Sequence, residues 1–165
     1  MHAYSPADWE TFFAAVTGAA AALTGLLFVA VSINLDRILV KESMLPARAA
    51  ETLATLLFVV ISLALPLVPQ NIHLVGAEIL VIAVPLFAVT LRNTVTYQRR
   101  NPDSPLYWSV SRMTSSAVAT VPGVLAGISL AARWGGGFYW LVPTVLLGIA
   151  GAVYGAWILL VEIAR

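Results

Sequence analysis

Five long runs of apolar residues alternate with short polar segments along this chain of 165 residues. Each run is close to the roughly 20 residues that a helix needs to cross the hydrocarbon core of a bilayer. Their apolar residues are continuous, unlike the alternating pattern of a membrane-barrel strand. The pattern predicts an all-α membrane protein whose residues 1–165 form one transmembrane domain. We expect five transmembrane helices, at about residues 12–35, 52–68, 74–97, 113–132 and 138–163.

Residues that start or stop helices lie between these runs. Ser5 followed by Pro6 is typical of a helix N-terminus, in which the serine side chain caps the first turn. The charged and apolar residues of segment 35–42 keep a helical spacing, which predicts that the first helix continues past residue 35. Further starts, stops and turns are expected at Pro46, Pro66, Pro69, residues 101–105 and the three glycines at 135–137.

The composition agrees with a lipid environment. Hydrophobic residues make up 60% of the chain and charged residues 10%, whereas a soluble domain carries about 25% charged residues. The net charge of +1 gives no basic field for nucleic acid. The chain has no cysteine, and its two histidines, His2 and His73, lie outside the predicted helices. We therefore expect no metal site and no cofactor.

The placement of lysine and arginine predicts the orientation. Of nine basic residues, eight fall on one side of a five-helix topology and only Arg133 falls on the other. Because basic loops stay in the cytoplasm, the N-terminus is predicted outside and the C-terminus inside. Aromatic residues are expected to form an outer belt at the headgroups: Trp9, Phe12, Phe13, Trp134, Phe138, Tyr139 and Trp140.

Small residues recur at spacings of three and four in three of the predicted helices. Such ridges let helix backbones approach closely where no hydrophobic force drives association. We expect packing within one subunit, or alternatively an interface between subunits of a homo-oligomer. The candidates are Gly18, Ala22 and Gly25 in the first helix, Gly123 and Gly127 in the fourth, and Gly151 and Gly155 in the fifth.

One side of the third predicted helix collects polar residues. Glu78 and Arg92 are fourteen residues apart, which returns to within 40° of the same face, and Thr96 and Pro85 share that face. Ionisable residues inside a membrane are functional candidates because their burial in lipid is costly. The hypothesis is a water-filled path with Glu78 and Arg92 at its two mouths. The alternative is that both charged groups extend to the headgroups.

Asn34 is a further candidate, near the inner end of the first helix. Beside Asp36 and Arg37 it could form an inner gate, although a helix end entering water is the favoured interpretation. His73 precedes Glu78 in the outer turn, where a solvated side chain is expected. The chain has no serine-hydrolase elbow, phosphate-binding loop or dinucleotide fingerprint, so an enzyme is not expected.

The stretch from Gly18 to Leu35, GAAAALTGLLFVAVSINL, resembles small polytopic membrane proteins of actinobacteria that are labelled as modulators of the FtsH protease. The resemblance implies a regulatory or adaptor role and a multi-pass protein of the plasma (inner) membrane. It brings no site motif, and so assigns no functional residue.

Two functions follow from these observations. The first is a homo-oligomeric channel or small transporter for ions or small solutes, favoured by the polar stripe and the glycine ridges. The second is a non-enzymatic adaptor or regulator subunit that binds a larger membrane protein, such as a membrane protease, within the bilayer.

Overall fold

The computed structural model describes residues 2–40, 45–100 and 106–164. Within them the chain forms five long helices: α1 (Pro6–Ile33), α3 (Leu45–Ala64), α4 (Ile72–Arg100), α5 (Leu106–Ala132) and α6 (Leu141–Ala164). The short elements are the helix α2 (Leu35–Val40) and the 3-10 helices η1 (His2–Tyr4), η2 (Leu65–Leu67) and η3 (Gly137–Trp140). The prediction of an all-α bundle is confirmed. The turn expected at residues 101–105 lies outside the described residues.

Four described segments are long and apolar enough to cross a membrane: Pro6–Ile33, Ala49–Leu67, Ile72–Thr96 and Gly137–Trp157. In α5 the stretch Ala117–Ala132 is also apolar, but it is shorter than the other four. The protein is therefore membrane-embedded.

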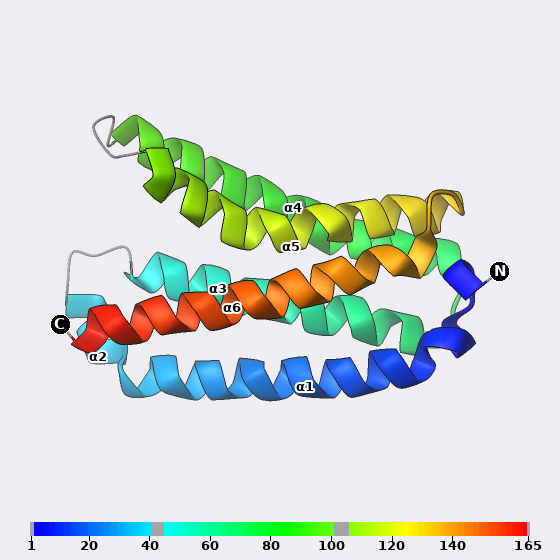
Figure 1. Cartoon of the computed structure of the whole chain (residues 1–165), viewed down its shortest axis with the longest axis horizontal. Helices are drawn as coiled ribbons and strands as arrows, with labels where there is room; N and C mark the ends of the chain where they lie inside the picture. Colours follow the sequence, from blue (N-terminus) through cyan, green and yellow to red (C-terminus); the bar gives the residue numbers. More distant parts are fainter. Residues whose placement is uncertain (1, 41–44, 101–105, 165) are drawn as a thin grey trace.

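The helices form a row in which α3 packs on α1, α6 on α3, α5 on α6, and α4 on α5. Figure 1 shows α1 along one edge, α3 and α6 in the middle, and the α4–α5 hairpin along the other edge. The N-terminus lies at one end of the bundle, and α2 and the C-terminus lie at the opposite end. These are called the N-terminal and C-terminal ends below. The row leaves α1 and α4 at opposite edges.

The main apolar core occupies the N-terminal part of the bundle. Phe13, Phe58 and Phe138 are completely buried there, and α4 joins the core only through residues 72–86. Pro85 lies inside α4 and Pro122 inside α5, where each removes a backbone hydrogen bond. Towards the C-terminal end the α4–α5 hairpin diverges from α3 and α6 (Figure 1). The two edges of the row are thus held together mainly at the N-terminal end.

Two local predictions about α1 were wrong. The helix breaks at Asn34, whose φ and ψ are −103° and 13°, so the following residues form the separate helix α2. Ser5 lies at the N-cap but makes no side-chain capping bond. The expected glycine turn is present, because Gly135, Gly136 and Gly137 all have positive φ. Only glycine adopts such angles without strain, which explains three in succession between α5 and α6.

Candidate functional site

The polar stripe predicted on the third helix lies on the outer side of α4. The side of α4 that packs on other helices contains the buried residues Ile79, Ala83 and Thr90. Glu78 is half-buried at the border of this side, whereas Pro85, Arg92 and Thr96 are exposed. In a single subunit these residues therefore face outward, and a path along them would need a neighbouring protein to enclose it.

Glu78 stabilises the turn between η2 and α4 through a hydrogen bond with Gln70. Its carboxylate oxygen Oε2 accepts a hydrogen bond from Nε2 of Gln70 at 2.8 Å, and the same amide donates to the Leu65 carbonyl oxygen at 3.3 Å. The contact gives this half-buried carboxylate a partner within the turn. Cation or proton binding by Glu78 stays a prediction.

His73 is bonded to α5, contrary to the expectation of a purely solvated side chain. Its Nδ1 lies 2.7 Å from the carbonyl oxygen of Ala131, to which it donates a hydrogen bond. The carbonyls in the last turn of a helix have no partner within that helix. His73 donates a hydrogen bond to one of these carbonyls and so joins the start of α4 to the end of α5.

Replacing His73 with alanine is expected to lower the free energy of unfolding by about 1 kcal/mol, because the Ala131 carbonyl loses its partner. Thermal unfolding in mild detergent, followed by tryptophan fluorescence, measures the change. His2→Ala is the matched control, since His2 bonds only its own chain end and its ring is 82% exposed. An equal loss in both variants would contradict the role of His73.

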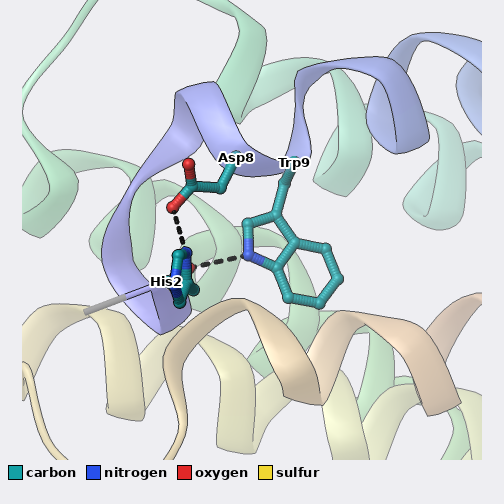
Figure 2. Close-up of polar contacts among 3 residues, drawn as sticks. All are labelled: His2, Asp8 and Trp9. Carbon is teal, nitrogen blue, oxygen red and sulfur yellow. Dashed lines mark hydrogen bonds and ion pairs between the residues drawn. The ribbon is translucent and has the colours of Figure 1, made fainter.

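The N-terminal segment forms a clamp over the turn between α5 and α6. His2 Nδ1 lies 2.8 Å from the Asp8 carboxylate, and Trp9 Nε1 donates to the His2 carbonyl oxygen at 2.8 Å. Figure 2 draws both contacts. The hydroxyl of Tyr4 accepts a hydrogen bond from the backbone N–H of Gly136 at 3.2 Å. The Tyr4 contact ties η1 to the turn that precedes η3 and α6, and the His2 contacts hold η1 against the first turn of α1.

Aromatic rings reinforce this clamp. The ring centroids of Phe13 and Phe138 are 5.1 Å apart, and those of Trp9 and Tyr139 are 4.9 Å apart. Phe13 and Phe138 are fully buried, so their assignment to a headgroup belt was wrong. Edge-on ring pairs of this kind stabilise a contact beyond the area they bury. Trp134 is exposed, as the belt prediction requires.

The glycines of α5 and α6 take part in packing contacts within the subunit. A methyl group added at Gly127 would come within 2.7 Å of Leu80, and one at Gly76 within 2.8 Å of the Gly127 carbonyl oxygen. Gly123 lies against the ring of Phe58 and Gly155 against Thr52. Gly151 is half-buried. Contact with neighbouring helices therefore accounts for Gly123, Gly127 and Gly155, and the closest backbone approach is between α4 and α5.

The small residues of α1 have no such role. A methyl group added at Gly18 or Gly25 would meet nothing within 4 Å, and Ala22 between them is exposed. Only 11% of the most apolar part of α1 is buried, against 28–39% in the other three candidate spans. The outward side of α1 through these three residues is called the α1 face below.

An apolar groove runs beside the α1 face, between α1 and α6. Its volume is about 360 Å³, and α3 forms its floor. Because α1 and α6 both pack on α3, their own surfaces stay apart along this part of the bundle. The groove is lined by Leu26, Ala30, Leu56, Ala152, Val153 and Trp157, among others.

Several polar groups in the helices are satisfied by their own backbone, whereas the buried hydroxyls of Thr17 and Ser62 have no hydrogen-bond partner among the described residues. The hydroxyls of Thr55, Thr94 and Thr144 each donate to the carbonyl four residues earlier. Asn34 Nδ2 does the same to the carbonyl oxygen of Ala30 at 2.9 Å, so Asn34 closes a helix end. In the ranges that the structure describes, no three His, Cys, Asp or Glu residues come close enough to hold a metal ion.

Comparison with known proteins finds no matching family model, no matching curated protein and no matching solved structure.

Proposed function

We propose that this chain is a non-enzymatic membrane subunit that binds another membrane protein through the α1 face, as an adaptor or regulator. The observation that supports it is the contrast between the glycines: those of α5 and α6 are packed, whereas Gly18 and Gly25 have open space beside them. Glycine in a helix interior costs about 1 kcal/mol relative to alanine in water. Gly18 and Gly25 pack against nothing within the subunit. Their small size therefore leaves room for a helix of another protein to approach closely.

Two further observations fit the same function. The α1–α6 groove adds an apolar recess beside the α1 face, and the exposed Trp157 is among its lining residues. Five helix hydroxyls donate to their own backbone and so offer no free donor to a solute path through one subunit: those of Thr24, Ser32, Thr55, Thr94 and Thr144. The resemblance of residues 18–35 to proteins labelled as protease modulators implies a partner of the same class, a larger membrane protein.

The test places a photo-crosslinking amino acid at Ala22 in the full chain, within its native membrane. We expect a protein adduct from Ala22 that is lost when Gly18 and Gly25 are both replaced by leucine. The space beside both glycines is open, so thermal unfolding of this variant should match that of the native protein.

The matched control is a crosslinker at Ala77 together with the variant Ala88→Leu, since both residues are exposed on α4. We expect no protein adduct from Ala77 and an undiminished adduct from Ala22 in the control variant. Adducts from Ala22 with lipid alone would overturn the proposal, as would a protein adduct that survives the double leucine substitution.

A second candidate function is a homo-oligomeric channel with α4 at the symmetry axis. The observation in its favour is that Arg92 and Thr96 are exposed and share a side of α4 with Glu78. Against it, the exposed residues between them are Val81, Pro85 and Val89, which give a water path no polar lining. Flux through liposomes containing the purified protein alone, abolished by Glu78→Gln, would establish this function in place of the first.

A further inference from the structure

One continuous stripe of exposed residues follows the outer side of α4. Its members are three or four positions apart, which keeps them on one helix face. The half nearer the N-terminal end is apolar and the half nearer the C-terminal end is polar. The members are Val81, Pro85, Val89, Arg92, Thr96 and Arg99, all of them exposed.

The polar half has no partner among the residues that the structure describes. Arg92 and Arg99 make no hydrogen bond or ion pair there, although each guanidinium carries five N–H donors. The hydroxyl of Thr96 is also unused. This is unlike the neighbouring Thr94, whose hydroxyl donates to the Thr90 carbonyl oxygen at 2.9 Å. The stripe therefore presents two fixed cations and a free hydroxyl on a single face.

The position of these groups matches the depth of lipid phosphates. The apolar run of α4 ends at Leu91, and the residues from Arg92 to Arg100 are mostly polar. At 1.5 Å per residue, Arg99 lies about 10 Å beyond Arg92 along the helix. The row of Arg92, Thr96 and Arg99 therefore begins at the border where hydrocarbon gives way to headgroups. Val81, Pro85 and Val89 continue the same stripe into the hydrocarbon.

We propose that this stripe binds an anionic phospholipid in the leaflet at the C-terminal end of the bundle. The guanidiniums of Arg92 and Arg99 donate to phosphate oxygens, and the Thr96 hydroxyl donates to an oxygen of the same headgroup. One acyl chain lies along Val89, Pro85 and Val81. A lipid without net charge is bound more weakly, because its own cation competes with the arginines for the phosphate.

This inference goes beyond the proposed function and involves the opposite edge of the bundle from the α1 face. It requires only that the outer side of α4 faces lipid. Loss of lipid binding and loss of partner binding are consequently separate results, obtained with substitutions in α4 and in α1 respectively.

The experiment titrates the delipidated full chain in detergent with phosphatidylglycerol, or with phosphatidylcholine of the same acyl chains, and counts bound lipids by native mass spectrometry. We expect phosphatidylglycerol to bind about tenfold more tightly. The double variant Arg92→Gln and Arg99→Gln should lose that preference, and Thr96→Val should weaken binding about threefold. Arg133→Gln is the matched control, because Arg133 is exposed at the opposite end of the bundle. It should retain the full preference.

Equal affinity for the two lipids would overturn the proposal, as would an unchanged preference in the double glutamine variant. Inorganic phosphate separates a lipid site from a site for a soluble anion. Competition by millimolar phosphate that depends on Arg92 and Arg99 would overturn the lipid assignment. Thermal unfolding of each variant checks that these exposed substitutions leave the fold intact.

Discussion

Replacing Gly76 with leucine is expected to prevent the α4–α5 hairpin from forming its native contact. A first side-chain carbon at this position would already lie 2.5 Å from the backbone nitrogen of Ala131 and 2.8 Å from the Gly127 carbonyl oxygen. Both obstacles are backbone atoms, so no side chain can rotate away to make room. Overpacking of a core costs about 1–3 kcal/mol where side chains can yield, and we expect a larger loss here.

The measurement is thermal unfolding in mild detergent, with Gly25→Leu as the matched control. The two substitutions add the same side chain to a helical glycine, but nothing lies within 4 Å of the position at Gly25. We expect Gly76→Leu to lower the unfolding temperature strongly or to abolish folding, and Gly25→Leu to leave it unchanged. Similar unfolding temperatures for the two variants would show that α4 and α5 do not meet as described.

Helix number and type were predictable because continuous apolar runs in a membrane leave the backbone few alternatives to helix. The boundaries of the helices were harder to predict. The apolar runs mark the lipid-embedded lengths, whereas α4 and α5 continue to Arg100 and from Leu106 through polar residues that the hydropathy pattern treats as loop. The break at Asn34 was also missed, because its side-chain bond to the Ala30 carbonyl closes α1 without any proline or glycine nearby.

The role of each glycine ridge was not predictable from spacing. Gly18 with Ala22 and Gly123 with Gly127 repeat at the same interval, yet only the second pair lies against other helices. The difference depends on which helices are neighbours, and that is a property of the whole bundle. The residue four positions after Gly76 is Leu80, which is not small, so no ridge of small residues indicated Gly76. Gly76 nevertheless makes the closest approach of α4 to α5.

For the polar residues too, the sequence predicts which groups share a helix face but not what that face contacts. Helical geometry placed Glu78, Pro85, Arg92 and Thr96 correctly on one side of α4, but it gave no indication that this side faces outward. The partners of Gln70 and His73 lie on neighbouring turns and on α5, and they became visible only when the turns were built. A single sequence identifies which groups share a face, and the packing decides what that face meets.

Replacing Phe13 with alanine is expected to release the start of α1 from the bundle. Phe13 is fully buried, with its ring between Trp9 and Phe138. In a membrane the side chain of an unpacked helix remains in lipid, so little transfer free energy is lost. The remaining loss of stability comes from the cavity that the substitution leaves and from the lost contacts between aromatic rings. Large-to-small core substitutions of this kind in water cost about 3–5 kcal/mol, and we expect about half of that here.

Phe28→Ala is the matched control, because Phe28 lies on the same helix with 62% of its surface exposed. Thermal unfolding in detergent should show a clear loss for Phe13→Ala and none for Phe28→Ala. Hydrogen exchange should locate the loss, with faster exchange in η1 and the first turns of α1 while α4 and α5 stay protected. Equal effects of the two substitutions, or faster exchange spread evenly over all helices, would mean that the aromatic cluster does not anchor α1. If α1 is the partner-binding helix, Phe13→Ala should also weaken the Ala22 crosslink, because a face held at one end only presents Gly18 and Gly25 in no fixed orientation.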